Sequence, residues 1–486
     1  MKYDVIVVGG GLGGLTAGAK LAREGRKVLL IEQHTQPGGC ATTFKRGDYT
    51  LEVGLHEMDG PSPRDMKNRI FSELAITENV NLVKVPEFYR FVSRDIDITI
   101  PHDPAEAAIV LKNRFPEETG GIDNYFEQIL NPKRKGPSGE TLPEMSVGTF
   151  LDSIITNEDL KLVLLGNLGY FHDDPYTLSM TYYNIAQGSY YGGGGASFIK
   201  GGSQMLSDHL ARFITSHGGE VLTGHLVTRF TFDNGTVSGV EYQKKRGSQT
   251  ENMNALASDI IMNSAPANFM SWLPESQSSL VASELQKQKT GASLLTVYFG
   301  FNKKLSSIGN KHYSTFLYDD SVKSQADILA NNHAPFEKRS FTFVDYGQID
   351  SGLAPDGKSV GAICCTDYLS DWEGLPKGEY RRKKEEVADI FTSRMEKLLP
   401  GFAEAVDYCE VGTAATVKRY TLTPGGAVYG FAQVPSKPQF DDKVLPANVH
   451  IASAWGKTGG GFSGAIFGGY LCAYNILRAK SQGAGR

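Results

Sequence analysis

A glycine-rich turn between two apolar runs at the start of the chain constrains its fold more than any other feature. Residues 5–8 read VIVV, four β-branched apolar residues that suit a strand buried on both faces of a parallel sheet. Gly9, Gly11 and Gly14 follow at GxGxxG spacing, and residues 12–24 have the pattern of a helix. A second apolar run, residues 28–31, ends on Glu32, 18 residues after Gly14. This order predicts an α/β domain of the Rossmann type that binds a dinucleotide.

Each glycine of the turn has a different physical role. Gly9 allows the tight turn, Gly11 lets backbone approach a pyrophosphate, and Gly14 lets the helix pack against the strand. Leu12 and Gly13 begin the helix, whose N-terminal amides and positive dipole end favour the pyrophosphate. Glu32, followed by Gln33, is placed to accept ribose hydroxyls. A glycine-rich turn without a ligand is the alternative, and an acidic residue at this place does not separate NAD from FAD.

A second glycine loop, PGGCATTF at residues 37–44, follows the second strand. The longer string EQHTQPGGCATTFKRGDYTLEVGLH resembles the N-terminal region of carotenoid isomerases and retinol saturases. These belong to a flavoprotein family that also includes phytoene-type desaturases and amine oxidases. The resemblance implies FAD as the cofactor. It places Gly39, Cys40, Ala41 and Thr42 along the diphosphate, Glu32 at the ribose, and Gly54, Leu55 and His56 near the isoalloxazine.

The resemblance is firm in two further segments, residues 198–265 and 415–475. In flavoproteins of this architecture, a segment like that of Val227 meets the adenine, and a strand like that of Ser264 passes beneath FAD. The last segment, VHIASAWGKTGGGFSGAIFGGYLCAYNIL, would approach the flavin N1/O2 edge with the amides near Gly461. The cofactor-binding residues implied there are Ala454, Trp455, Gly461, Phe462, Ser463 and Ala465.

The predicted fold class is α/β, with a Rossmann-like FAD-binding domain of the GR2 type and a discontinuous α+β substrate domain. The FAD domain would comprise residues 1–60, 191–266 and 412–486, and the substrate domain residues 61–190 and 267–411. No second GxGxxG occurs, so no dedicated NAD(P)H domain is expected. Asn234-Gly235 predicts a hairpin turn, Asp103-Pro104 a helix start, and Ser203 the N-cap of another helix.

Composition excludes several classes of function. A net charge of −5 and a pI near 6.1 argue against a nucleic-acid partner. The five cysteines lack paired metal-ligand spacing, so no metal site is expected. No apolar run has the length of a membrane span, and the first strand begins at residue 3, which leaves no room for a signal peptide. We expect a cytoplasmic protein and leave open a peripheral contact with the cytoplasmic face of a membrane.

The function implied by the resemblance is an FAD-dependent oxidoreductase. It would act on C=C bonds of a long apolar polyene, carotenoid- or retinoid-like, by saturation or by redox-neutral cis–trans isomerisation. The alternatives are a phytoene-type desaturase, an amine-oxidase-like flavoenzyme, and a non-enzymatic prenyl-protein escort of the GDP-dissociation-inhibitor type. The intact nucleotide motif argues against the escort. A quinone, oxygen and a nicotinamide all stay open as the electron partner.

Candidate substrate and proton-transfer residues flank the flavin motifs. Aromatic residues near the proposed flavin loops either line an elongated cavity or pack in the core, and the resemblance favours the cavity. These residues are Tyr182, Tyr190, Tyr191, Tyr420, Tyr429 and Phe431. His56 and Glu57 adjoin the segment expected at the isoalloxazine, and Lys457 lies near the C-terminal flavin loop. These three are the catalytic candidates, and a structural role is the alternative for each.

Overall fold

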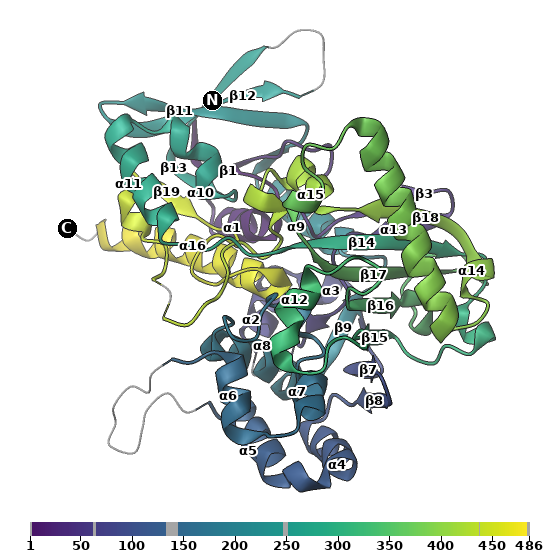
Figure 1. The fold of residues 1–486 in the computed structure, drawn as a ribbon. Coiled ribbons are helices and arrows are strands. Elements are labelled where there is room, and N and C mark those ends of the chain that lie inside the picture. The colour runs from purple at the N-terminus through teal and green to yellow at the C-terminus, as the bar shows by residue number, and fades with distance from the viewer. Residues whose placement is uncertain (1, 62–64, 133–143, 246–250, 437, 484–486) are drawn as a thin grey trace, which may run out of the picture.

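The computed structural model describes residues 2–61, 65–132, 144–245, 251–436 and 438–483, which form two seven-stranded sheets with helices packed around them (Figure 1). The first sheet has the order β10-β2-β1-β13-β12-β11, and β19 pairs with β13 outside this path. Its strands are β1 (Lys2–Val8), β2 (Val28–Ile31), β10 (Glu220–Leu222), β11 (His225–Asp233), β12 (Thr236–Lys244), β13 (Asn252–Met262) and β19 (Val449–Ile451).

The core of the first sheet is a run of parallel strands, as the apolar sequence predicts. β1 pairs in parallel with both β2 and β13, and β2 pairs in parallel with β10. Residues 5–7 and 28–30 have no exposed surface, because Val5 and Val7 pack into the core on one face of the sheet and Ile6 packs into the core on the other. Helix α1 (Leu12–Arg23) packs on β1 and β2, and α9 (Gln204–Ser216) and α16 (Gly461–Gly483) pack against α1.

The second sheet is mostly antiparallel and has the order β18-β14-β17-β16-β15-β7-β8. Its strands are β7 (Tyr89–Ser93), β8 (Ile96–Ile100), β14 (Ser293–Phe301), β15 (Ser314–Leu317), β16 (Phe341–Asp345), β17 (Ser359–Asp367) and β18 (Val406–Gly412). The long helix α13 (Lys377–Leu398) packs its apolar side, including Val387 and Phe391, into the core of this sheet. The strands of the two sheets thus come from alternating segments of the chain. The boundaries of the FAD and substrate domains given above remain a prediction.

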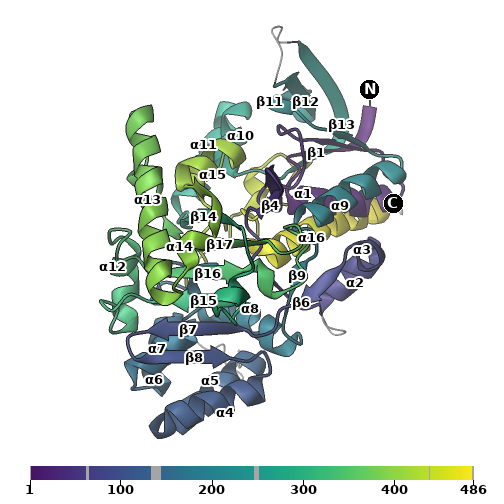
Figure 2. The same cartoon turned by 90° about the vertical axis from the view of Figure 1, so that its right-hand side faces the viewer.

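Helices gather beyond the β7–β8 edge of the second sheet, at the end of the molecule away from the β11–β12 hairpin (Figures 1 and 2). They are α4 (Pro104–Arg114), α5 (Thr119–Leu130), α6 (Val147–Ile154), α7 (Glu158–Leu164) and α8 (Met180–Gly192). The smaller strands are β3 (Thr43–Arg46), β4 (Tyr49–Glu52), β5 (Met58–Asp59), β6 (Leu82–Lys84) and β9 (Ala196–Ile199). The remaining α-helices are α2 (Met66–Glu73), α3 (Ile76–Asn79), α10 (Pro266–Phe269), α11 (Glu275–Gln286), α12 (Ile328–Asn332), α14 (Phe402–Ala405) and α15 (Ala414–Thr421).

Two of the three local turn and cap predictions are fully confirmed. Asn234 and Gly235 join β11 to β12 with φ of 47° and 78°, the left-handed conformation of a type I′ turn. Asp103 caps α4, accepting hydrogen bonds from the amides of Ala105 and Glu106 at 2.9 and 3.0 Å. The prediction for Ser203 is confirmed in position only: Ser203 is the N-cap residue of α9, but its side chain donates to the buried Glu52 at 2.7 Å and makes no capping hydrogen bond among the described residues.

Among the described helices, none combines the length and the apolar character that crossing a bilayer requires.

Close packing between α1 and α16 depends on glycine. A β-carbon on Gly469 would lie 2.1 Å from the carbonyl oxygen of Gly13, and one on Gly13 would lie 1.8 Å from that of Ala452. Both separations are far below contact distance, so these backbones meet only because side chains are absent. The beginning of α1 is thereby held against the middle of α16 and against the segment that follows β19.

We expect Gly469→Ala to destabilise the protein by about 1–3 kcal/mol, because the added methyl group forces two backbones apart in a packed core. Thermal unfolding measures the loss. Gly378→Ala is the matched control, since it makes the same change in α13, where nothing lies within 4 Å. That control should be neutral or stabilising by up to about 1 kcal/mol. Equal melting temperatures for Gly469→Ala and the wild type would contradict this account of the packing.

Candidate active site

A cavity of about 1130 Å³ runs from the β1–α1 turn to the second sheet and α8. It exceeds the 300–1,000 Å³ of typical small-molecule sites, which suits a dinucleotide together with a substrate. Gly9, Glu32 and Val227 line one part of it, whereas Tyr190 and Phe341 line another. The cavity therefore joins the two sheets.

At the nucleotide end, backbone amides fix the carboxylate of Glu32. The side chain is 7% exposed, and its two oxygens accept hydrogen bonds from Gly10 N at 2.6 Å and His34 N at 2.7 Å. An ionised carboxylate has about four acceptor positions, so two such bonds leave capacity for a ligand. A fixed carboxylate at the cavity wall fits ribose hydroxyls, which are donors.

Two glycine loops form a cradle that side chains would fill. Gly11 and Gly38 form an isolated parallel bridge, and a β-carbon on Gly39 would lie 3.3 Å from the Gly11 Cα. Gly11 is also the N-cap of α1 and provides no side-chain acceptor for the first helical amides. Bare backbone and uncapped amides at a helix start are the features that bind a pyrophosphate. The residues present therefore fit the diphosphate of FAD.

A buried carboxylate holds the loop expected near the flavin. Glu52 is 2% exposed and accepts hydrogen bonds from the amides of Gly54 at 3.2 Å and Leu55 at 3.0 Å. The amide and hydroxyl of Ser203 also donate to it, each at 2.7 Å. Burial raises the pKa of Glu52, while these hydrogen bonds lower it by less, so the net pKa is above the ordinary value. The bonds fix residues 54–55 relative to the start of α9.

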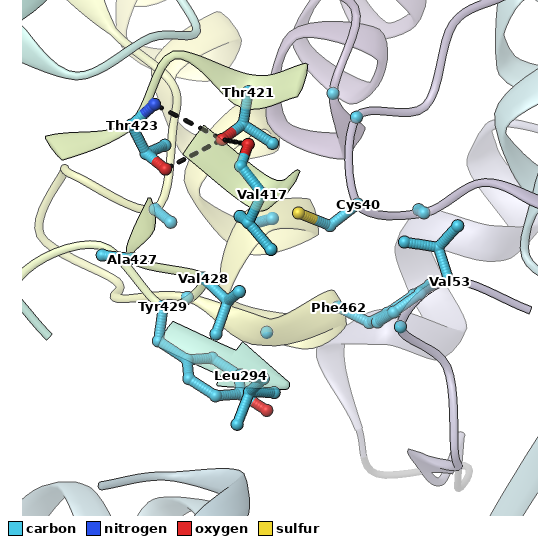
Figure 3. Close-up of a pocket in the computed structure, with 18 of the residues that line it drawn as sticks. Cys40, Val53, Leu294, Val417, Thr421, Thr423, Ala427, Val428, Tyr429 and Phe462 are labelled. Atoms are coloured by element: carbon cyan, nitrogen blue, oxygen red, sulfur yellow. Dashed lines mark hydrogen bonds between the residues drawn. The ribbon is translucent and has the colours of Figure 1, made fainter. Parts of the chain in front are cut away.

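The start of α16 enters the cavity beside this loop. Gly461, Phe462 and Ser463 line the cavity, and Ser463 donates a hydrogen bond to Asp59 at 2.6 Å. Asp59 in turn pairs with the buried ammonium of Lys67. Figure 3 shows Val53 and Phe462 on one side of this part of the lining and Tyr429 on the other. A helix N-terminus stabilises a nearby negative charge, so this end suits an anionic reduced flavin edge.

Most of the predicted cofactor-binding residues line the cavity. Those that do are Gly9, Gly11, Leu12, Gly13, Glu32, Gln33, Gly39, Cys40, Ala41, Thr42, Gly54, His56, Val227, Ser264, Ala454, Trp455, Gly461, Phe462, Ser463 and Ala465. Gly14 and Leu55 lie outside the lining. A β-carbon on Gly14 would meet the Gly9 carbonyl at 2.2 Å, and Leu55 is fully buried. The individual roles of all these residues stay predictions.

The predicted substrate residues divide into two groups. Tyr182, Tyr190 and Tyr429 line the cavity. Tyr191 lies in the core, with its ring 5.1 Å from that of Phe88. Phe431 packs its ring 4.8 Å from that of Trp455, outside the lining.

Tyr420 also lines the cavity, but at the nucleotide end. Its ring lies 5.1 Å from that of His34, two residues after Glu32. Its carbonyl oxygen accepts a hydrogen bond from Gln33 Nε2 at 3.1 Å. The structure thus places Tyr420 beside the predicted ribose site and away from the aromatic residues of α8.

His56 and Glu57 are brought to the cavity, and Lys457 is not. His56 Nδ1 lies 3.2 Å from the Tyr170 hydroxyl, and burial lowers the pKa of His56 to about 4, so the imidazole is neutral at pH 7. Glu57 is 8% exposed, and its Oε2 has no hydrogen-bond partner among the described residues. Burial first, and then the charges of Glu87 and Asp59, raise the pKa of Glu57 well above its ordinary value. Lys457 is exposed, with Nζ 3.5 Å from Asp442.

Sequence reasoning missed much of the apolar lining. Leu168, Tyr170, Phe171, Phe316, Tyr318, Val322, Ile328 and Phe341 all line the cavity. They come from a turn after α7, from β15 and β16, and from the segments around α12. Their apolar character was visible in the sequence, but no motif distinguishes them from ordinary core residues.

Fold and cavity together define a flavoprotein with a Rossmann-like FAD-binding fold. The chain belongs to the family of flavin-containing amine oxidoreductases, which matches residues 12–477. It is therefore a flavin-dependent oxidoreductase with FAD as its cofactor. The family match and the relatives below support an enzyme of this class. When bound, FAD would supply the hydride chemistry, as the group that accepts or donates hydride.

Curated relatives are similar over nearly the whole chain. The chloroplastic prolycopene isomerase of Arabidopsis thaliana is 26% identical over 98% of this chain and 82% of its own length. The all-trans-retinol 13,14-reductase of Danio rerio is 24% identical over 98% of this chain and 86% of its own length. Among solved structures, putrescine oxidase covers 98% of this chain and 99% of its own, with a TM-score of 0.64 and 15% identity. This last similarity concerns the fold alone.

We expect Gly11→Val to abolish FAD binding, because a branched side chain would occupy the cradle between the two glycine loops. Glu32→Ala should only weaken binding, since one ribose contact among many is lost. FAD released into the supernatant by heat denaturation, per mole of protein, measures occupancy. Gly378→Ala serves as the folded control. Equal occupancy in Gly11→Val and the wild type would refute the assignment of this loop to the pyrophosphate.

A carboxyl group with a raised pKa makes stability depend on pH with a defined sign. Glu57 favours the folded state most strongly below its unfolded pKa of about 4.3, and this contribution falls as pH rises towards the raised folded pKa. We expect the unfolding free energy of the wild type, relative to Glu57→Gln, to fall by up to about 1.4 kcal/mol per pH unit over that range. Urea unfolding in excess FAD at several pH values measures the difference. Glu78→Gln, at an exposed position of α3, is the control, and parallel curves for wild type and Glu57→Gln would contradict the expectation.

Proposed function

We propose that the protein uses FAD to act on C=C bonds of a long apolar polyene, carotenoid- or retinoid-like, by saturation or by redox-neutral cis–trans isomerisation. The observation that carries this proposal is the continuation of the cavity beyond the flavin-side loops into an aliphatic and aromatic section. That section includes Leu168, Tyr170, Phe171, Tyr182, Ile185, Tyr190, Phe316, Tyr318, Val322, Ile328 and Phe341. Burying apolar surface there contributes roughly 25 cal/mol per Å² before the costs of association. A long hydrocarbon can thus be bound without a charged group to hold it.

The residues around His56 fit this chemistry. Saturation of a C=C bond adds a proton as well as a hydride, and Glu57 is a cavity carboxyl group whose pKa burial raises well above its ordinary value, which favours the protonated form. His56, held by the hydroxyl of Tyr170 and by a hydrogen bond from Tyr313 to its carbonyl oxygen, shapes the wall beside it. In this proposal Glu57 holds the proton, and the aromatic lining orients the polyene and excludes water.

The names of the relatives support a polyene substrate. Prolycopene and retinol are both conjugated polyenes, and the two relatives are named as an isomerase and a reductase of these compounds. Desaturation of a similar substrate is compatible with the same cavity. The direction depends on the electron partner, for which a quinone, oxygen and a nicotinamide stay open.

We further propose that the substrate enters from a lipid surface. Ile185 of α8 lines the cavity and is nevertheless 58% exposed, so it marks an apolar position where the cavity meets the outside. A peripheral enzyme at the cytoplasmic face of a membrane could take up a polyene there without releasing it into water. Apolar docking of this kind resists high salt, because screening weakens only electrostatic attachment.

Amine oxidation is the second candidate, favoured by one observation. Among the described residues, none makes a hydrogen bond to the Oε2 atom of Glu57, and an ionised carboxylate at a cavity wall could pair with a substrate ammonium group. The raised pKa of Glu57 opposes this candidate, because it disfavours the ionised carboxylate that would pair with an amine.

We expect all-trans-retinol or a lycopene isomer, presented in phosphatidylcholine vesicles, to change the FAD absorption spectrum of the purified protein under anaerobic conditions. Small aliphatic amines should leave the spectrum unchanged. Co-sedimentation with the same vesicles in high salt measures lipid attachment. Free FAD with the same additions is the control. Bleaching by amines, together with no response to any polyene, would overturn the proposed function in favour of amine oxidation.

A further inference from the structure

A small second cavity of about 20 Å³ adjoins the apolar section of the main one. Phe171, His172, Tyr182 and Tyr429 line both cavities, so the small cavity is a side chamber of the large one. A volume of this size holds about one water-sized group. It is too small for any hydrocarbon end of a polyene.

The side chamber contains two buried polar residues with unused hydrogen-bonding capacity. The side chain of His172 is 2% exposed, and its Nε2 atom has no hydrogen-bond partner among the described residues. Ser293, at the start of β14, is also 2% exposed, and its Oγ atom has no partner in the same set. Leaving two such groups unpaired is costly, at roughly 1–3 kcal/mol each, so a polar ligand in the chamber would be favoured.

The other side of the His172 ring is fully engaged. Nδ1 lies 2.8 Å from Asp173 Oδ1, and the amides of Asp173 and Asp174 approach the same nitrogen at 2.9 and 3.1 Å. The hydroxyl of Tyr368 donates to Asp173 Oδ2 at 2.9 Å and fixes that carboxylate. These contacts all involve Nδ1, whether or not that nitrogen carries the ring proton. Nε2 is therefore the ring nitrogen that can bind a ligand.

We propose that the side chamber binds the hydroxyl group at the end of an otherwise apolar substrate, while the hydrocarbon chain lies in the main cavity between Tyr182 and Tyr429. A hydroxyl group both donates and accepts, so it can pair with Nε2 of His172 in either tautomer and still has capacity for the hydroxyl of Ser293. A pure hydrocarbon leaves both residues unpaired or paired only with water. This inference rests on the proposed function and refines it, since it selects alcohols among the polyenes.

The test compares three probes that differ only at one end: all-trans-retinol, its deoxy hydrocarbon and its methyl ether. Dissociation constants come from anaerobic titration of the flavin spectrum of the holoenzyme. We expect retinol to bind about 10–100-fold more tightly than the hydrocarbon, the effect of one or two hydrogen bonds to buried groups. The methyl ether should also bind more weakly than retinol, because its methyl group exceeds the chamber.

Two substitutions locate the effect. Ser293→Ala removes one partner without enlarging the lining appreciably, and His172→Asn keeps a polar atom near the Nδ1 position while removing Nε2. Each should reduce the preference for retinol over the hydrocarbon by about tenfold. Ser93→Ala is the matched control, because the hydroxyl of Ser93 is also buried and without a partner in the described set, yet Ser93 lines neither cavity. FAD content and melting temperature verify folding.

The possible outcomes separate the two proposals. Equal affinity for retinol and its hydrocarbon in the wild type means that the chamber holds water only, and it overturns this inference while leaving the proposed function intact. A preference for retinol that persists unchanged in both variants also overturns it. Binding of none of the three probes contradicts the proposed function, and this inference with it.

Discussion

The arrangement of the active site depends on one buried carboxylate. Glu52 accepts hydrogen bonds from the amides of Gly54 and Leu55 and from both the amide and the hydroxyl of Ser203. These contacts join the β3–β4 hairpin and the adjacent loop that leads to His56 to the start of α9, where Ser203 lies 151 residues after Glu52. A buried charge without partners is strongly unfavourable, so the four donors must stay in place for the fold to hold. Glu52 therefore fixes the position of the loop at residues 54–56, although Glu52 itself does not line the cavity.

The nucleotide half of the molecule was predictable because its constraints are local. Gly9, Gly11 and Glu32 act through backbone geometry and a fixed position at the end of a strand, and both leave marks in the sequence. The turn at Asn234 and Gly235 was predictable for the same reason. Ser203 shows the limit of this reasoning. From the sequence alone, a serine that caps a helix cannot be distinguished from a serine that donates a hydrogen bond to a distant carboxylate such as Glu52.

The substrate half was less predictable because its lining is assembled from distant segments. Tyr190 and Tyr191 are neighbours on α8 and both rings pack against Phe88, yet only Tyr190 lines the cavity. Successive residues of a helix differ by about 100° in direction, and only the packed partners decide which direction is the cavity. Tyr420 likewise could not be placed from its aromatic character, because the contact of α15 with His34 is a tertiary feature. The side chamber at His172 had no sequence motif either.

The contact between Tyr420 and the segment after Glu32 has a kinetic consequence. The carbonyl oxygen of Tyr420 accepts hydrogen bonds from the side chains of Gln33 and His34, and Lys245 donates to Gln33 from the β12 side. These bonds tie the end of α15 across the nucleotide end of the cavity. Exchange of bound cofactor with solution then requires this segment to open locally, which costs less than unfolding the protein. The residence time of FAD should accordingly depend on these few surface hydrogen bonds as well as on the deeper contacts that determine its orientation.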